Sequence, residues 1–278
     1  MSGSAGAGLH RPTAERVAPM LLTPTLGAVA ADVAQRVLAE PDRYALYSDF
    51  DGTLVEIALR PEDVYVPPDL PARLARVRAM LGGAFALITG RSLREIEAHV
   101  GDAGLEASGL HGIEFRFDDE AARAPAREAP HHLIAEVVGI VAADPGLRLE
   151  HKGPILAVHY REAPAAGGRV KIALEQAVTA LRLPYHLKEG RAVVEIIPNG
   201  TSKGTALADF MRRTPYVGRI PIMIGDDRAD EDAFAVAEAA GGLGLKVAGE
   251  HFRGGDEPFR NPGEVRAFLA MIAAGPAR

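Results

Sequence analysis

The sequence predicts an α/β fold in which a doubly wound, mostly parallel sheet carries a smaller inserted α+β unit. Two observations support this prediction. Short unbroken apolar runs alternate with amphipathic helical patterns in residues 41–116 and again in 199–278, as expected around buried parallel strands. Between them, residues 117–198 contain runs that alternate polar and apolar positions. We therefore expect a core in two halves around an inserted unit, preceded by an N-terminal extension over residues 1–40.

The first half of the core alternates strands and helices. Asp69 is a candidate N-cap for a helix whose apolar residues recur on one face. Ser92 and Glu95 form a Ser-x-x-Glu capping box, which marks the start of a second helix that Gly101 stops. The expected elements are a strand at 44–47, a helix at 70–81, a strand at 85–88, a helix at 93–100 and a strand at 106–110.

The inserted unit follows a segment of different composition. Residues 117–130 are charged and rich in alanine and proline, which predicts a linker or loop. After it, a pattern of one helix and two strands occurs twice, which predicts an α-β-β-α-β-β unit. The expected elements are 132–143, 147–152 and 155–161, and then 169–181, 185–188 and 191–198.

The second half of the core resumes the alternation of helices and strands. The expected core elements are a helix that ends at 213, a strand at 220–224, a helix at 230–240, a strand at 243–247 and a helix at 262–273.

The N-terminal extension is expected to contain a surface helix at 26–38, which has no assigned role. Residues 1–8 are small and polar, and are expected to be a disordered tail.

Composition narrows the classes of function. The net charge of −6, from 31 basic and 37 acidic residues, leaves no basic excess for a nucleic-acid backbone. The absence of cysteine excludes disulfides and zinc–thiolate sites. No apolar run approaches the roughly 20 residues of a membrane-spanning helix, and the N-terminus lacks the pattern of a signal peptide. We therefore expect a cytoplasmic protein that binds neither nucleic acid nor membrane.

The most informative segment is Asp49-Phe50-Asp51-Gly52-Thr53, which places two carboxylates directly after the first strand. Other chemically capable side chains also follow apolar runs or precede helices; they are Thr89, Lys203, Asp226, Asp227 and Asp230. Because ligands bind at the carboxyl ends of the strands in open α/β sheets, we expect these side chains to form one site. The alternative is that the two aspartates merely open a glycine turn at a strand end.

Together these residues resemble the four motifs of the haloacid-dehalogenase (HAD) superfamily of phosphohydrolases: an Asp-x-Asp pair, a Thr or Ser, a Lys and an acidic loop. The resemblance implies a Rossmann-like HAD core with an inserted cap domain. It also implies that Asp49 attacks phosphorus and forms an aspartyl-phosphate, and that Asp51 acts as general acid and then as general base. Thr89 and Lys203 would hold the phosphoryl oxygens.

The resemblance further implies a catalytic Mg²⁺. A phosphate dianion repels a carboxylate nucleophile, and a cation held by hard oxygen ligands offsets that repulsion in a site without cysteine. The ligands implied are Asp49, Asp51 and Asp226, with Asp227 and Asp230 supporting them or completing the shell.

A narrower resemblance, to the trehalose-6-phosphate phosphatase family, covers about residues 44–268. It rests on Gly-Leu-His-Gly-Ile-Glu at 109–114, Glu-His-Lys-Gly at 150–153, His-Tyr-Arg at 159–161 and Arg-Ala-Val-Val-Glu-Ile-Ile-Pro at 191–198. The resemblance implies a cap of the larger, C2 type. It also implies that the disaccharide is bound by Glu150, Lys152, Arg161, Arg191 and Glu195. Arg191 stands where the family often has lysine. Further substrate-binding candidates are Gly90, Arg91 and His111.

The expected activity is therefore Mg²⁺-dependent hydrolysis of trehalose 6-phosphate to trehalose and phosphate, by a monomer or weak homo-oligomer. One alternative is another HAD sugar phosphatase or phosphomutase, such as a sucrose-phosphate or mannosyl-type phosphatase. Another is a phospho-acceptor signalling domain, which needs no inserted cap. Individual residues also have simpler interpretations: the cap charges as a solvated sheet face, His111 as a turn histidine, and Arg91 as the partner of a core carboxylate.

Overall fold

The computed structural model describes residues 26–58, 63–101, 104–118, 120–123, 128–190 and 192–275. The tail expected at residues 1–8 and the candidate substrate ligand Arg191 lie outside these residues. No helix in the described ranges is long and apolar enough to cross a bilayer.

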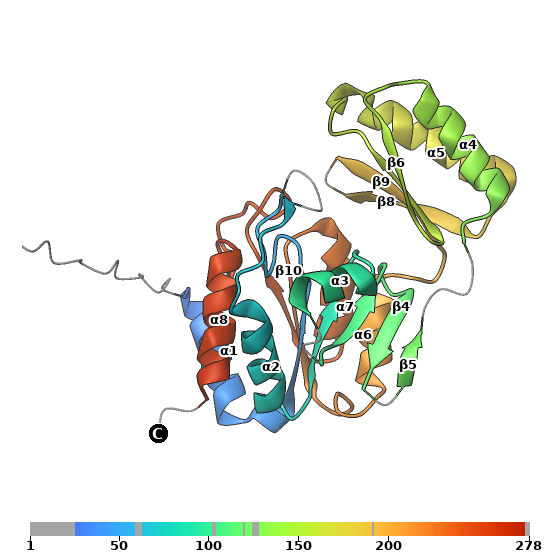
Figure 1. The fold of residues 1–278 in the computed structure, drawn as a ribbon. Helices are drawn as coiled ribbons and strands as arrows, with labels where there is room; N and C mark the ends of the chain where they lie inside the picture. The colour runs from blue at the N-terminus through green and yellow to red at the C-terminus, as the bar shows by residue number, and fades with distance from the viewer. Residues whose placement is uncertain are drawn as a thin grey trace, which may run out of the picture.

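The larger sheet contains seven strands in the order β11-β10-β1-β2-β3-β4-β5 (Figure 1). The strands from β11 to β3 are parallel, whereas β4 and β5 are antiparallel to their neighbours. This arrangement confirms the predicted doubly wound, mostly parallel fold. The strand bounds are β1 Tyr44–Ser48, β2 Phe85–Ile88, β3 Glu106–Gly109, β4 Glu114–Phe117, β5 Glu120–Arg123, β10 Ile220–Gly225 and β11 Leu243–Lys246.

Helices cover both faces of this sheet (Figure 1). One face carries α1 (Ala28–Ala39), α2 (Leu70–Met80) and α8 (Pro262–Ala274), which pack on one another. The other carries the adjacent helices α6 (Lys203–Met211) and α7 (Glu231–Ala239), and α3 (Leu93–Val100) contacts β3 and β4. The sheet is therefore buried on both sides, which explains why its central strands are continuous apolar runs.

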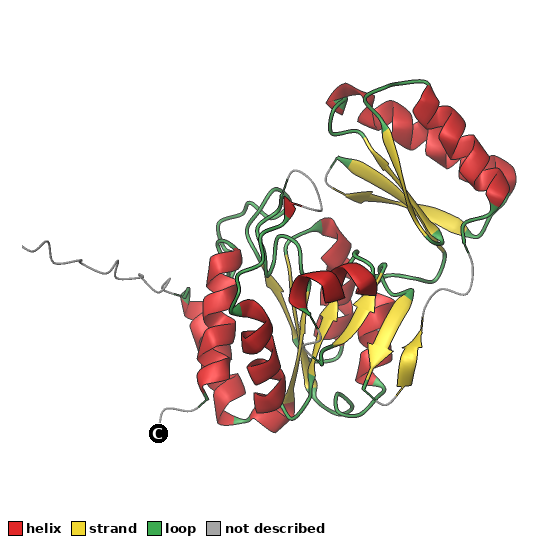
Figure 2. Cartoon of the chain, viewed as in Figure 1, coloured by secondary structure: helices red, strands yellow, loops and turns green. Residues whose placement is uncertain are grey.

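The smaller sheet has four antiparallel strands in the order β6-β7-β9-β8. Two helices cover its face away from the larger sheet, as Figure 2 shows in red over yellow. This inserted unit has an apolar cluster of its own, separate from that of the larger sheet. The element bounds are α4 His131–Ala142, β6 Arg148–Lys152, β7 Ile155–His159, α5 Gly167–Leu181, β8 Tyr185–Gly190 and β9 Val193–Pro198.

The uncovered face of the smaller sheet carries charged side chains. The register pairs Glu150 with Ala157, Ala157 with Glu195, and Glu195 with Lys188. Because directly paired residues share a face, these four form one row across the sheet.

A small apolar contact joins the two parts of the fold. Leu110, in the loop after β3, packs with Ile155 and Ile197 of the smaller sheet, and all three are buried. The charged face is thereby held against the carboxyl edge of the larger sheet.

The starts of α3 and α2 and the segment 117–130 agree with the sequence predictions to different degrees. The capping box of Ser92 and Glu95 is formed at the start of α3, as predicted. The prediction for Asp69 is wrong in part: it occupies the N-cap position of α2, but its carboxylate makes no capping hydrogen bond and pairs with Arg73 instead. The loop expected at 117–130 contains the edge strand β5, which composition alone did not indicate.

Candidate active site

The structure brings four of the predicted site residues to the carboxyl edge of the larger sheet. Asp49 follows β1, Thr89 follows β2 and Asp226 follows β10, while Lys203 opens α6. All four are buried. They surround the position at which the sheet reverses its winding, because β1 lies between β2 and β10. Open α/β sheets bind their ligands at such a switch point.

A cavity of about 800 Å³ lies between this edge and the charged face of the smaller sheet. This volume falls within the range of roughly 300–1,000 Å³ that small-molecule sites occupy. Among the residues that line it are Asp49, Asp51, Thr89, Gly90, Arg91, His111, Lys203, Asp226 and Asp227 from the core, and Glu150, Lys152, His159, Arg161, Lys188 and Glu195 from the inserted unit.

Lys203 is the charged centre of the core half of the site. Its Nζ lies 2.9 Å from Asp49 Oδ2 and 2.7 Å from Asp230 Oδ1. Burial alone would lower the pKa of Lys203, but the two carboxylates raise it well above its ordinary value. Lys203 is therefore a permanent cation beside Asp49.

The carboxylates beside Lys203 carry more negative charge than this one lysine can balance. Ligand atoms of Asp49, Asp226 and Asp230 all lie within 4.8 Å of one another. Burial raises the pKa of Asp49 to about 7, with Lys203 opposing the shift. Burial, followed by the charges of Asp49 and Asp230, raises the pKa of Asp226 to about 8. A divalent cation with oxygen ligands fits such a group, because it would supply the missing charge.

The loop after β1 packs tightly against this cluster. Gly52 adopts φ +73°, and a Cβ atom on it would lie 2.0 Å from Asp226 Oδ2. Thr53 donates a hydrogen bond of 3.2 Å from Oγ1 to Asp226 Oδ1. The Gly-Thr pair of the motif therefore positions Asp226, a role that sequence reasoning did not assign.

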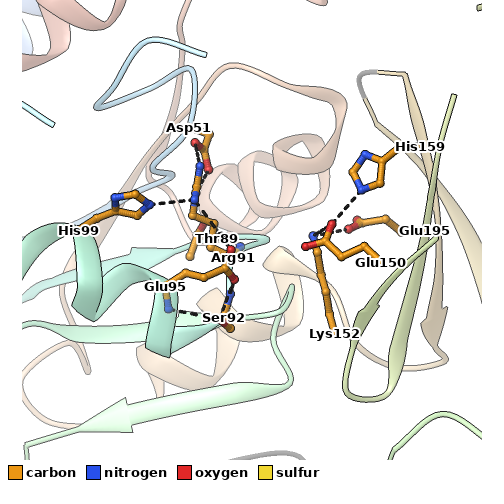
Figure 3. Close-up of polar contacts among 10 residues, drawn as sticks. All are labelled: Asp51, Thr89, Arg91, Ser92, Glu95, His99, Glu150, Lys152, His159 and Glu195. Carbon is orange, nitrogen blue, oxygen red and sulfur yellow. Dashed lines mark hydrogen bonds and ion pairs between the residues drawn. The ribbon is translucent and has the colours of Figure 1, made fainter. Parts of the chain in front are cut away.

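The other two aspartates of the predicted metal site are engaged elsewhere. Asp51 accepts two hydrogen bonds from the guanidinium group of Arg91, of 2.6 Å from Nε and 2.7 Å from Nη2 (Figure 3). Asp227 accepts from the backbone N–H of Arg228 and caps the short 3₁₀ helix Arg228–Asp230. Asp230, expected either to support the metal ligands or to complete the shell, lies within the carboxylate cluster.

Arg91 also contacts His99, whose Nε2 lies 3.0 Å from its Nη1 (Figure 3). Arg91 was expected either to bind substrate or to pair with a core carboxylate. The structure shows the pairing, with Asp51. Arg91 still lines the cavity, so the first interpretation stays a prediction.

On the cap side, Glu195 joins the two parts of the site. Its Oε1 lies 3.1 Å from Lys152 Nζ, and its Oε2 lies 2.8 Å from His111 Nε2. Burial would raise the pKa of Glu195, but His111 and Lys152 together lower it below its ordinary range. Glu195 is therefore an ionised carboxylate that bridges the cap sheet and a core loop.

His111 is held in an unusual backbone conformation. His111 and its neighbour Leu110 have φ values of +55° and +48°. The imidazole covers Gly90, where a Cβ atom would lie 2.7 Å from the ring. Burial lowers the pKa of His111. Residues held at positive φ cluster at functional sites, because the surrounding structure must compensate their strain.

The remaining cap residues lie around the bridge. Glu150 Oε2 lies 2.8 Å from His159 Nε2 and 3.9 Å from Lys152 Nζ (Figure 3). Arg161 reaches the backbone carbonyl of Ala58 in the core, at 3.5 Å.

Sequence reasoning did not select His159 or Lys188 as site residues, although both line the cavity. Pairing the two expected strands at 185–188 and 191–198 could have identified Lys188, because it lies directly opposite Glu195.

Comparison with known proteins places the chain in a family. The family model described as trehalose-phosphatase matches residues 47–262. A probable trehalose-phosphate phosphatase of Sinorhizobium fredii is 37% identical over 228 residues, which span 82% of this chain and 86% of that protein. The trehalose-6-phosphate phosphatase of Escherichia coli is 37% identical over 209 residues, which span 74% of this chain and 77% of that protein.

Solved structures give the same fold. The C-terminal domain of the Candida albicans (C. albicans) trehalose-6-phosphate phosphatase superposes with a TM-score of 0.76 at 18% identity, covering 91% of this chain and 99% of that one. The likeness of fold and the match over most of the sequence agree with the carboxyl-edge cluster and the capped cavity described above. The chain belongs to the trehalose-phosphatase family, whose members are phosphoric monoester hydrolases.

Proposed function

We propose that this protein hydrolyses trehalose 6-phosphate to trehalose and inorganic phosphate. The observation that carries the proposal is the composition of the cavity. One wall has a buried carboxylate beside a permanent cation, Asp49 and Lys203, which suits a phosphoryl group. The opposite wall has charged and polar groups, among them Glu150, Lys152 and Glu195, which suit the hydroxyls of a sugar. The names of the curated relatives support this substrate.

In the proposed reaction Asp49 attacks phosphorus, and the ester bond to the sugar oxygen breaks as the aspartyl-phosphate bond forms. Lys203 and Thr89 hold the phosphoryl oxygens and stabilise their charge in the transition state. Asp49, Asp226 and Asp230 are the residues that would hold Mg²⁺, which would offset the repulsion between the dianion and the nucleophile. The contribution of Asp51 as a further ligand stays a prediction.

Asp51 is the proposed proton donor to the leaving sugar oxygen, and afterwards the base that accepts a proton from the attacking water. In this structure both carboxylate oxygens of Asp51 accept hydrogen bonds from Arg91, whereas a proton donor must face the leaving oxygen. We therefore propose that Asp51 exchanges Arg91 for the leaving oxygen when substrate binds. The one-third exposure of the Asp51 side chain (34%) leaves room for this exchange.

We also propose a division of the chain into an N-terminal extension (1–40), two core segments (41–116 and 199–278) and a cap domain (117–198). The separate apolar cluster of the inserted unit supports it. Within the range 117–198, the strand β5 pairs with β4 and so belongs to the larger sheet, which moves the start of the cap beyond Arg123. We further propose a cytoplasmic monomer or weak homo-oligomer. Size-exclusion chromatography with light scattering tests the oligomeric state.

A phosphate-release assay tests the proposed function. Trehalose 6-phosphate is compared with glucose 6-phosphate, sucrose 6-phosphate and mannose 6-phosphate, with and without added Mg²⁺. We expect the highest kcat/KM for trehalose 6-phosphate and loss of activity when divalent cations are chelated. A higher kcat/KM for another sugar phosphate would reassign the substrate while leaving the phosphatase chemistry intact.

A further inference from the structure

Lys188 occupies a distinctive place on the cap. It lies on β8 directly opposite Glu195, on the face that lines the cavity. Its Nζ reaches across to the core and donates a hydrogen bond of 3.2 Å to the backbone carbonyl of Ala229. Ala229 belongs to the acidic loop, between Asp226 and Asp230. The ammonium group of this cap residue is therefore set against the core half of the site.

The cavity contains two other lysines, and both are neutralised. Lys203 pairs with Asp49 and Asp230, and Lys152 lies 3.1 Å from Glu195. Lys188 differs, because among the described residues no carboxylate lies within ion-pair distance of it and its one hydrogen-bond partner is a neutral carbonyl. An ammonium group has three N–H donors, so two stay available.

The surroundings of Lys188 disfavour its charged form relative to the same group in water. Burial lowers its pKa, and the nearby charge of Lys203 lowers it further, while Asp232, Asp230 and Glu195 act in the opposite direction. A partly dehydrated cation without a bound counter-ion attracts an anion that enters the same cavity. The phosphate monoester of the proposed substrate is such an anion.

We propose that Lys188 is a phosphate-binding residue contributed by the cap, which uses its two remaining donors on the phosphoryl oxygens of the substrate. The proposal rests on the phosphatase function proposed above and extends it. The substrate phosphate is then held from both sides, by Lys203 and Thr89 of the core and by Lys188 of the cap. Because Lys188 already contacts the acidic loop, the bound dianion ties the cap to the core, and its release loosens that tie.

Inhibition by the two reaction products tests this proposal. Hydrolysis of p-nitrophenyl phosphate by the full-length protein is measured with increasing inorganic phosphate, and separately with increasing trehalose. The variants are Lys188→Gln, Lys188→Arg and a control, Lys171→Gln. Lys171 is a lysine of the same unit that lies on α5 and pairs with Glu189. Thermal unfolding of each variant verifies that it is folded.

We expect Lys188→Gln to raise the inhibition constant of phosphate about tenfold or more, the usual effect of losing a hydrogen bond between charged groups. The constant for trehalose should not change, because trehalose carries no charge for Lys188 to bind. Lys188→Arg should restore most of the phosphate affinity, and Lys171→Gln should match the wild type.

Two results would overturn the proposal. Equal weakening of phosphate and trehalose would mean that Lys188 only docks the cap through Ala229. No change in the phosphate constant would mean that Lys188 does not contact the anion. Failure of the proposed substrate is a separate outcome: the wild type would then hydrolyse p-nitrophenyl phosphate but show no inhibition by trehalose, and the phosphate arm would still test Lys188.

Discussion

Replacement of Glu195 by alanine should separate sugar recognition from phosphoryl transfer. Glu195 is 7% exposed and accepts hydrogen bonds from Lys152 and His111, so its removal leaves buried polar groups without their partner. Lys152 keeps a second carboxylate, Glu150, at 3.9 Å, which offsets part of the loss. We therefore count one hydrogen bond to a charged group, worth about 1.5–3 kcal/mol, or roughly a ten- to hundredfold effect.

The assay compares two substrates. For trehalose 6-phosphate, kcat/KM should fall by this factor, because the cap groups that contact the sugar are no longer held in place. For p-nitrophenyl phosphate kcat/KM should change little, because this small aryl ester carries no sugar for the groups around Glu195 to contact. The matched control is Glu175→Ala, which removes an exposed carboxylate from α5 of the same unit and should behave like the wild type.

The contact between Glu195 and His111 allows a sharper version of this test. A double-mutant cycle with His111→Ala should give an interaction energy of about 0.5–3 kcal/mol in kcat/KM for the sugar ester. An equal loss on both substrates would show that Glu195 acts only by docking the cap and does not contribute to sugar recognition. Unchanged activity on both would place Glu195 outside the site.

The same carboxylate should affect stability in a pH-dependent way. Its pKa is lower in the folded protein than in the unfolded chain, so it stabilises the fold above the unfolded pKa of about 4.3 and loses that contribution as the pH falls through the folded value. The difference in free energy of unfolding between the wild type and Glu195→Gln should therefore shrink below about pH 4. Urea titrations at several pH values measure this difference, and a difference that grows on acidification would contradict the assignment.

Three further substitutions probe the core. Asp49→Asn should abolish turnover while leaving the melting temperature near that of the wild type, because the amide keeps the shape but is not a nucleophile; turnover within about tenfold of wild type would remove Asp49 from that role. Asp51→Asn should impair the sugar ester more than p-nitrophenyl phosphate, whose leaving group needs little protonation; equal rate losses would indicate a structural role. Gly52→Ala should lower both stability and activity more than Gly200→Ala: both positions have positive φ, but only at position 52 would the added Cβ atom lie 2.0 Å from Asp226 Oδ2. Thermal unfolding and kcat/KM, measured on both variants, check this last comparison, and equal effects would show that backbone strain alone matters.

The core of the fold was predictable because its signals are local. Unbroken apolar runs predicted the parallel strands, and the residues that follow them, Asp49, Thr89 and Asp226, could be expected at one edge from the geometry of parallel sheets. The capping box at Ser92 was readable for the same reason, because a cap involves only the first turn of a helix. The failure at Asp69 shows the limit of such signals: Arg73, one turn further along the helix, competes for the same carboxylate.

The contacts between cap and core were not predictable in this way. His111 and Glu195 are 84 residues apart and meet only because the inserted sheet is placed over the carboxyl edge. Strand alternation identifies the charged face but does not specify which core loop that face meets. The pairing of Asp51 with Arg91 is also tertiary, since it joins two loops that follow neighbouring strands; the sequence indicated a core carboxylate as one possible partner of Arg91 but did not specify Asp51.

The proposed mechanism requires that the phosphoryl group of trehalose 6-phosphate passes to Asp49. To detect this transfer, the reaction is quenched with acid during turnover of trehalose 6-phosphate, and the phosphoryl group is located in the protein by peptide mass spectrometry. We expect one phosphoryl group, on Asp49, which forms while trehalose is released and is lost on treatment with hydroxylamine. Release of trehalose with no phosphoryl group on the protein at any quench time, or with the group on another residue, would contradict this mechanism.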